Sequence, residues 1–222
     1  MSVMTSPSLK QRAYAQFARI AQALASDRRL EIVDLLAQGP RHVEALADII
    51  GIPVANVSQH LQVLKQARLV TSERSGTKVV YQLAGDDVLR LWIDLQRVGR
   101  SHIAEVKQIE RESAPQDAEG AELPRDSVMQ VLHEGAVLID VRPPLEYKHG
   151  HLPGAISVPL DTLSAIFDDL PRGRPIIAYC RGTYCQSADE AVAFLRQRGY
   201  EAVRLEGGWP EWVAEGRPAE PE

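Results

Sequence analysis

Apolar residues recur every three or four positions through the first half of the chain, which is the spacing of one face of an α-helix. The pattern predicts a helix over residues 8–25, with Tyr14 and Phe17 on its apolar face. A second helix is expected to end at Gly39-Pro40, because this pair of residues terminates helices. The beginning of the chain is therefore predicted to be helical.

A tight turn at Gly51 separates two further predicted helices, one over 42–50 and one that begins after Pro53. Two helices joined by a short glycine turn form a helix-turn-helix, an arrangement used by many DNA-binding proteins. Three apolar residues of the second helix are expected to point inward: Val57, Leu61 and Leu64. Its polar residues are then left on the outer face.

A change to β-branched residues over 69–83, on either side of Arg74-Ser75-Gly76-Thr77, predicts a β-hairpin with glycine at its tip. One long helix is expected to follow over 86–110. Its apolar stripe is too long for the small core of this half to cover. We therefore expect this helix and the helix at 8–25 to form the interface of a homodimer.

Short apolar runs alternate with helical segments in the second half, which is typical of a parallel sheet covered by helices. Strands are expected at about 137–141, 155–157, 176–179 and 202–205. The segment between the halves holds two prolines, small residues and several acids without apolar periodicity, which predicts a linker. The expected organisation is a first domain over 1–111, a linker over 112–124 and a second domain over 125–222.

Charge is divided unevenly between the halves. Residues 1–112 hold 15 Lys and Arg against 12 Asp and Glu, whereas residues 113–222 hold 10 against 18. Because phosphate is repelled by an acidic surface, nucleic-acid binding is expected in the first half only. No apolar run approaches the roughly 18 residues that a membrane span needs, and the N-terminus lacks the pattern of a signal peptide. We expect a cytoplasmic protein with no membrane partner.

The order of the first-half elements resembles the ArsR/SmtB family of winged-helix repressors. The resemblance is carried by RRLEIVDLLAQGP, VEALADIIGIPVANVSQHLQVLKQARLV and SERSGTKVVYQL, which cover most of residues 8–110. It implies an α+β winged helix-turn-helix domain whose homodimer binds an inverted repeat in double-stranded DNA. Polar side chains on the second helix of the motif and on the wing suit base edges and phosphates. The expected DNA contacts are Asn56, Ser58, Gln59, His60, Gln62, Arg74 and Lys78.

Neither metal site known in that family is expected here. The thiolate site needs cysteines in the helix before the turn, where RLEIVDLLAQG has none. The second site needs paired ligands on the last helix, and Asp86 and His102 lack the paired spacing. We expect no metal ion and no cofactor.

The chain has two cysteines, Cys180 and Cys185, and both lie in the stretch YCRGTYCQSA. A buried-strand pattern over 176–179 precedes Cys180, and an amphipathic helix begins at Ser187. Cys180 is therefore expected at the carboxyl end of a strand, where open α/β sheets bind ligands. Backbone N–H groups of such a loop and the helix dipole favour an anion, so we expect Cys180 to be held as the nucleophilic thiolate.

The second half resembles a single-domain rhodanese over residues 125–214, through DVR, EY, GHLPGA, the cysteine loop and EGG with Trp212. The resemblance implies an α/β fold with a parallel sheet and helices on both faces. It also implies that Cys180 takes sulfane sulfur from thiosulfate, a polysulfide or a persulfide, becomes a persulfide and passes the sulfur on. The loop around it would be built by Arg181, Gly182, Thr183 and Tyr184. Asp140, Arg142 and Glu146 are expected to brace the fold by hydrogen bonds.

Cys185 is not required by a rhodanese mechanism, and two interpretations stay open. It is either a small buried residue at the start of the helix or a resolving thiol that captures the Cys180 persulfide. A disulfide, trisulfide or tetrasulfide is conceivable, depending on the shape of the loop. Zinc is disfavoured, because two thiolates make only half of a site.

The sequence thus leaves three functional hypotheses. The favoured one is a transcriptional regulator, expected to be a repressor, whose rhodanese domain senses sulfane sulfur through Cys180 and Cys185. The second is a sulfurtransferase for which DNA binding is secondary. The third is an arsenite or heavy-metal sensor that uses the two thiols as ligands.

Overall fold

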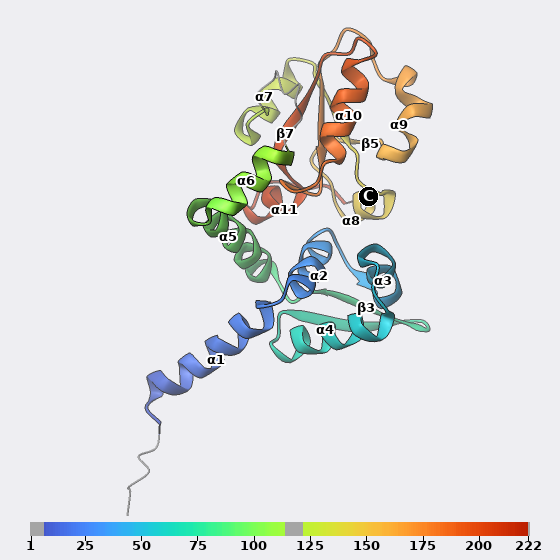
Figure 1. Cartoon of the computed structure of the whole chain (residues 1–222). Helices are drawn as coiled ribbons and strands as arrows, with labels where there is room; N and C mark the ends of the chain where they lie inside the picture. The colour runs from blue at the N-terminus through green and yellow to red at the C-terminus, as the bar shows by residue number, and fades with distance from the viewer. Residues whose placement is uncertain (1–6, 114–121, 222) are drawn as a thin grey trace, which may run out of the picture. The chain divides into compact units, whose positions relative to one another are not determined.

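A computed structural model describes residues 7–113 and 122–221 (Figure 1). The chain divides into two compact units, Met1–Leu89 and Arg90–Glu222. The boundary falls inside helix α5, which spans Asp86–His102. Of the predicted linker, residues 114–121 lie outside the described residues.

The first unit is built from helices and a small sheet. Its elements are α1 (Leu9–Leu24), α2 (Asp27–Ala37), β1 (Arg41–His42), α3 (Val43–Ile50), α4 (Val54–Gln66), β2 (Val70–Ser75), β3 (Lys78–Leu83) and the start of α5. The three strands form an antiparallel sheet in the order β1-β3-β2. The predicted hairpin is confirmed, and its turn is made by Gly76 with φ 60° and Thr77.

The predicted helix-turn-helix is also confirmed. Helix α3 ends at Gly51, whose φ of 72° is the left-handed conformation that glycine adopts without strain. Helix α4 then begins after Pro53. Its inward residues are fully buried in the core of the unit: Val57, Leu61 and Leu64.

Two apolar faces in this half are not covered by the single chain. On α1, Tyr14 is 58% and Phe17 is 63% exposed. On α5, the apolar residues Leu91, Leu95 and Val98 are 40%, 40% and 48% exposed. These are the faces expected to pair in a homodimer.

The single helix predicted over 86–110 is wrong, because the structure contains two helices, α5 and α6 (Ala104–Ser113), separated at Ile103. A straight helix would place Arg100 and Glu110 about 15 Å apart along its axis. In the structure the Arg100 Nε lies 2.9 Å from a Glu110 carboxylate oxygen. The break therefore turns the chain back far enough to form this ion pair, which periodicity alone does not predict.

The second unit continues through short helices and the strands of a larger sheet. After α5 and α6 its elements are η1 (Arg125–Ser127), α7 (Val128–His133), β4 (Val137–Asp140), α8 (Pro144–His149), β5 (Ile156–Ser157), α9 (Leu160–Ile166), η2 (Phe167–Asp169), β6 (Ile176–Cys180), α10 (Ser187–Arg196), β7 (Ala202–Gly208) and α11 (Trp209–Ala214). The four strands are parallel, in the order β5-β4-β6-β7. The predicted parallel sheet is confirmed.

Helices cover both faces of this sheet (Figure 1). One apolar core joins the strands to α9 and α10 and contains Leu163, Ala191 and Leu195. The other joins them to α7 and α11 and contains Val128 and Trp212. Strand β6 runs between the two cores with all five of its residues buried. Its carboxyl end is the position of Cys180.

Candidate functional site

The cysteine loop occupies residues 181–186, between the end of β6 and the start of α10. Two glycines shape it. Gly182 has φ 138°, a backbone conformation that favours glycine. Gly208 of β7 lies so close to the loop that a Cβ there would strike the Cys180 carbonyl oxygen and the Gly182 backbone. The glycines therefore allow β7 to pack directly beneath the loop.

Cys180 is fully buried, with 0% of its surface exposed, and it packs in the same core as Ala188 and Ala191 of α10. Its Sγ lies 3.2 Å from the carbonyl oxygen of Cys185 and 3.8 Å from that of Gly182. Its hydrogen bond to the Cys185 side chain and its burial raise the pKa of Cys180 well above the usual value for a thiol. The Gly182 backbone and the Arg204 charge lower the pKa of Cys180, as the expected anion cradle would, but they are the smaller effects. The thiolate expected at Cys180 therefore stays a prediction.

Cys185 is half-buried, at the end of the loop. The largest effect on it is the hydrogen bond from the Cys180 side chain, and Ser187 and the backbone of Arg181 also hydrogen-bond to its sulfur. Together they lower the pKa of Cys185 from 9.0 to about 5, against the opposing effect of burial. Backbone groups of the loop thus favour the anion at both sulfurs, those of Arg181 and Ser187 at Cys185 and that of Gly182 at Cys180.

The two side chains are hydrogen-bonded to each other, which raises the pKa of Cys180 and lowers that of Cys185. The carbonyl oxygens of Gly182 and Cys185 accept from the Cys180 S–H group. No disulfide joins the two, and both are free thiols.

Arg181, expected in the loop, is directed to a carboxylate outside it. Its guanidinium donates to both oxygens of Glu146 of α8, at 2.6–3.0 Å. The Glu146 side chain is fully buried, so this ion pair ties the loop to α8. Glu146 therefore braces the loop itself.

Two residues that the sequence did not point to hold the loop backbone. Glu211 of α11 accepts from the Thr183 hydroxyl at 3.3 Å and from its N–H at 3.4 Å. Arg204 of β7 donates to the carbonyl oxygens of Gly182 and Thr183, at 3.0 and 3.2 Å, and pairs with Asp189 of α10. The sequence predicted a strand at Arg204, but it gave no sign that Arg204 and Glu211 meet at the loop.

Tyr184 is the part of the loop that reaches outward, and it is 50% exposed. Its hydroxyl donates to Glu110 of α6 at 3.1 Å, and the Arg100 guanidinium of α5 lies 5.7 Å from its ring centroid. Burial raises the pKa of the Tyr184 hydroxyl, which keeps it a neutral donor. All three residues belong to the second unit.

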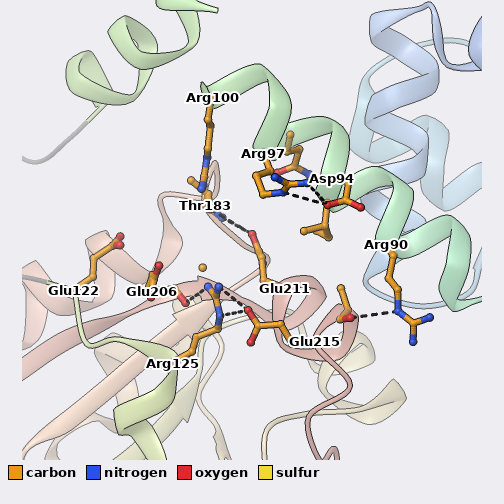
Figure 2. Close-up of a pocket in the computed structure, with 14 residues that line it drawn as sticks. Arg90, Asp94, Arg97, Arg100, Glu122, Arg125, Thr183, Glu206, Glu211 and Glu215 are labelled. Atoms are coloured by element: carbon orange, nitrogen blue, oxygen red, sulfur yellow. Dashed lines mark hydrogen bonds and ion pairs between the residues drawn. The ribbon is translucent and has the colours of Figure 1, made fainter. Parts of the chain in front are cut away.

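A pocket of about 410 Å³ opens beside Thr183 and Glu211 (Figure 2). Four arginines line it, and each has a partner: Arg90 with the Ala214 carbonyl, Arg97 with Asp94, Arg100 with Glu110 and Arg125 with Glu215. Three of these guanidinium groups thus already have a carboxylate partner, and the fourth donates to a backbone carbonyl.

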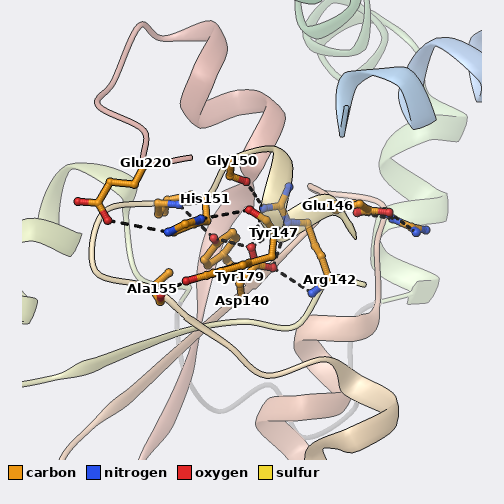
Figure 3. Close-up of polar contacts among 11 residues, drawn as sticks. Asp140, Arg142, Glu146, Tyr147, Gly150, His151, Ala155, Tyr179 and Glu220 are labelled. Atoms are coloured by element: carbon orange, nitrogen blue, oxygen red, sulfur yellow. Dashed lines mark hydrogen bonds and ion pairs between the residues drawn. The ribbon is translucent and has the colours of Figure 1, made fainter. Parts of the chain in front are cut away.

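A buried polar network supports the carboxyl end of the sheet (Figure 3). The Asp140 and Arg142 side chains form an ion pair at 2.6 Å with both side chains fully buried. The Tyr179 hydroxyl donates to Asp140 at 2.6 Å, and Arg142 donates to the Gly150 carbonyl at 2.7 Å. These contacts are the bracing hydrogen bonds expected from the sequence.

In the first unit, α4 carries five of the residues expected to contact DNA. Asn56, Gln59 and Gln62 are exposed, whereas Ser58 and His60 are half-buried. The Ser58 hydroxyl donates to the Val54 carbonyl at 2.8 Å, so its proton is used within the helix. The outer face of α4 therefore offers mainly the amide side chains.

The wing carries the other two expected contacts, Arg74 and Lys78, and both are exposed. The Arg74 Nε lies 3.4 Å from the Gly76 carbonyl at the tip. The Lys78 ammonium lies 3.3 Å from His42, the residue that caps α3. Both cations stay at the surface of the hairpin.

Within residues 7–113 and 122–221, no group of three or more His, Cys, Asp or Glu side chains is arranged to hold a metal ion. In the same residues, no helix combines the length and the apolar character required to cross a membrane.

Comparison with protein families finds two matches, one in each half of the chain. The model described as "Bacterial regulatory protein, arsR family" matches residues 26–72. The model described as "Rhodanese-like domain" matches residues 124–215. The first match contains α3, α4 and the start of the wing, and the second contains the cysteine loop.

Some similar proteins match both halves of the chain, and others match one half only. The HTH-type transcriptional regulator Rv0324 of Mycobacterium tuberculosis is 42% identical over 208 residues, which cover 92% of this chain and 90% of that protein. A sulfurtransferase of Allochromatium vinosum is 33% identical over 86 residues, which cover 38% of this chain and 78% of that protein. Among solved structures, the homodimeric winged helix-turn-helix DNA-binding domain of a possible ArsR-family regulator from Mycobacterium bovis is 44% identical, with a TM-score of 0.42 over 45% of this chain and 94% of that one.

Proposed function

Because this chain belongs to the ArsR family of bacterial regulatory proteins and carries a rhodanese-like domain, we propose that it is a repressor that releases DNA when its cysteine loop takes up sulfane sulfur. It acts in the cytoplasm, where its DNA is. The proposal has a DNA-binding part, a sulfur part and a connection between them.

The DNA-binding part is a homodimer on an inverted repeat. Exposed apolar residues on α1 and α5 provide a surface for a second copy. Helix α4 lies in the major groove, and the wing contacts the phosphate backbone. The DNA contacts are Asn56, Ser58, Gln59, His60, Gln62, Arg74 and Lys78. Among these, the exposed amides Asn56, Gln59 and Gln62 are best placed to pair with base edges.

The sulfur part is persulfide formation at Cys180, with Cys185 as the resolving thiol. The donor is thiosulfate, a polysulfide or a persulfide. Once Cys180 holds a persulfide, the Cys185 thiolate attacks its inner sulfur. The product is a Cys180–Cys185 disulfide, and the outer sulfur leaves as hydrosulfide. The direct hydrogen bond between the two side chains supports this pairing.

The observation that supports a connection between the sulfur part and the DNA-binding part is the hydrogen bond from Tyr184 of the loop to Glu110. Glu110 in turn forms an ion pair with Arg100 of α5. Helix α5 runs from the first unit into the second. A loop rearranged by sulfur would displace Tyr184 and so change the contacts of the helix that we assign to the dimer interface. A coupling of about 1–3 kcal/mol gives a 5- to 150-fold change in affinity.

The test uses the full-length protein and a DNA duplex selected from a random pool by the reduced protein. Fluorescence anisotropy measures binding before and after treatment with glutathione persulfide. We expect the persulfide to weaken binding by about 5- to 150-fold. Cys180→Ser should bind the duplex normally and should not respond. Tyr184→Phe should take up sulfur normally but respond less.

A second function is favoured by the relative described as a sulfurtransferase. In that case the chain turns over thiosulfate or a persulfide as its main work. Fast steady-state transfer, with DNA affinity indifferent to sulfur loading, would establish it and reject the sensor. An arsenite arm tests the third hypothesis: release of DNA by arsenite, requiring both thiols, would favour a thiol-based metalloid sensor.

A further inference from the structure

A pair of polar side chains joins the start of α3 to the wing. His42 of β1 lies opposite Val80 of β3 in the small antiparallel sheet. Lys78 stands two positions before Val80, so its side chain leaves the same face of the sheet as that of His42. The Lys78 Nζ atom lies 3.3 Å from the His42 Nε2 atom. The register of the two strands therefore brings the ammonium and the imidazole together.

The other ring nitrogen of His42 serves as a helix cap. The backbone N–H of Ala45 donates to His42 Nδ1 at 3.1 Å, which makes His42 the N-cap of α3. A neutral imidazole has one nitrogen that accepts a hydrogen bond and one that carries a hydrogen. Because Nδ1 accepts, the hydrogen resides on Nε2, the nitrogen that faces Lys78.

The neighbouring carboxylate of Glu44 does not change this assignment. One of its oxygens lies 3.1 Å from His42 Nδ1. When the ring is protonated, Nδ1 donates to Glu44 and Nε2 keeps its hydrogen, because both nitrogens of a cationic imidazole are donors. The one remaining form, with its hydrogen on Nδ1 alone, directs an N–H group at the N–H of Ala45 and loses the cap.

Two hydrogen-bond donors thus face each other across 3.3 Å. They cannot bond to each other, because neither an ammonium group nor a protonated ring nitrogen has a free lone pair. Both groups can be reached from solvent, since the His42 side chain is 32% exposed and Lys78 is exposed. An anionic oxygen placed beside the pair accepts from both donors at once.

We propose that His42 and Lys78 together bind one phosphate of the DNA backbone. His42 is then a DNA contact in addition to those assigned above, and this inference rests on the DNA-binding part of the proposed function. In helix-turn-helix complexes the first helix of the motif crosses the backbone while the second lies in the major groove. The first helix here is α3, and His42 stands at its start. A phosphate is therefore the anion that this position meets.

The two side chains make different contributions to the site. The Lys78 ammonium supplies the positive charge on a flexible stem. The His42 N–H supplies direction, because the hydrogen bond from Ala45 holds the ring in one orientation. A phosphate oxygen held by both groups fixes the position of the wing relative to α3 on the DNA.

The experiment measures binding of the reduced full-length protein to the selected duplex and to a duplex of scrambled sequence, by fluorescence anisotropy. The test variant is His42→Asn, because asparagine also caps helices but places no N–H group at the position of Nε2. The matched control is His133→Asn, at an exposed histidine of α7 in the second unit. Unfolding temperatures verify that both variants are folded.

We expect His42→Asn to weaken binding by about fivefold, which corresponds to the loss of one hydrogen bond of about 1 kcal/mol. Because a phosphate contact carries no sequence information, the loss should be the same for the selected and the scrambled duplex. His133→Asn should bind both duplexes as the wild-type protein does. The inference is overturned if His42→Asn keeps wild-type affinity for both duplexes, or if it loses affinity for the selected duplex alone.

A second measurement identifies the phosphate that the pair shares. Single phosphates of the selected duplex are replaced in turn by neutral methylphosphonates, so that one negative charge is removed at a time. At one position of each half-site the replacement should weaken the wild-type protein more than it weakens His42→Asn or Lys78→Ala. If the two variants lose sensitivity at different phosphates, the side chains bind separately and the shared site is rejected.

Failure of the phosphate site and failure of the proposed function give different results. If the reduced protein binds the duplex and His42→Asn matches it, the site is rejected and the repressor stands. If His42→Asn loses affinity but glutathione persulfide leaves the DNA affinity of the wild-type protein unchanged, the site stands and the sensor is rejected. If the reduced protein binds no duplex, both are rejected.

Discussion

On α4 the candidate DNA contacts Asn56, Gln59 and Gln62 stand on the exposed face of one regular helix. In the cysteine loop, by contrast, the polar groups are held by residues from distant segments: Arg181 by Glu146 of α8, Thr183 by Glu211 of α11, and Tyr184 by Glu110 of α6. The exposed face of α4 thus depends on local structure, whereas the cysteine loop depends on tertiary contacts.

This difference has a consequence for mutations. Exposed side chains without shared partners act independently, so a substitution on α4 should change DNA binding and little else. Residues that share one network are coupled, so a substitution near the loop should alter stability, loop shape and sulfur chemistry together. Four predictions test this contrast.

The largest expected effect is the difference in acidity between the two thiols. Because the pKa of Cys185 is lowered to about 5, its thiolate should persist at neutral pH and disappear only as the pH falls through about 5. Cys180, whose pKa is raised, should stay protonated over the same range. The pH profile of iodoacetamide labelling, followed by peptide mass spectrometry, measures this. A Cys185 profile that rises only between pH 8 and 9, as for a free thiol of pKa about 8.5, would contradict the assignment.

Asp140→Ala should be strongly destabilising, because it leaves the charge of Arg142 buried without its carboxylate partner. Breaking a buried ion pair from one side costs about 3–5 kcal/mol. Denaturant unfolding of the full-length protein measures the loss. Asp168→Ala is the matched control, since Asp168 forms an exposed pair with Arg172 and such pairs contribute about 0–1 kcal/mol. Equal losses of stability in the two variants would contradict the expected difference between a buried ion pair and an exposed one.

Gln59→Ala should weaken DNA binding by about 1–3 kcal/mol if its amide pairs with a base edge. Its stability should change by no more than about 0.5 kcal/mol, because the side chain is exposed. Gln66→Ala, at the far end of the same helix, is the control and should bind the selected duplex normally. Equal loss of DNA affinity in both variants would show that α4 does not present its N-terminal half to the bases.

Glu211→Ala should loosen the cysteine loop with only a small loss of global stability. It removes two hydrogen bonds to Thr183, at 3.3 and 3.4 Å, and an average hydrogen bond contributes about 1 kcal/mol. Hydrogen exchange of the amides in residues 181–186 should quicken. Glu206→Ala, at an exposed position of β7, should leave that exchange unchanged. Unchanged exchange in Glu211→Ala would mean that the other contacts of the loop, from Arg204 and Glu146, hold it without Glu211.

Much of the fold was predictable because its signals are local. Gly51 and Pro53 marked the turn of the helix-turn-helix, and four short apolar runs marked the strands of the parallel sheet. The prediction failed at Ile103, where α5 ends and α6 begins. There the apolar spacing continues without interruption, but the Arg100–Glu110 ion pair requires the chain to turn. The spacing of apolar residues along a helix does not indicate a contact between side chains ten positions apart.

The sequence by itself determined the order of elements, the position of Cys180 at the carboxyl end of a buried strand and the polar face of α4. These follow from periodicity and from the turn chemistry of glycine and proline, which depend on neighbouring residues only. Only the tertiary structure decided the surroundings of the thiols. The Cys180 sulfur faces the carbonyl oxygens of Gly182 and Cys185, and Cys180 is buried beneath α10. Spacing along the chain fixes neither, because both are set by the path of the loop between β6, β7 and α10.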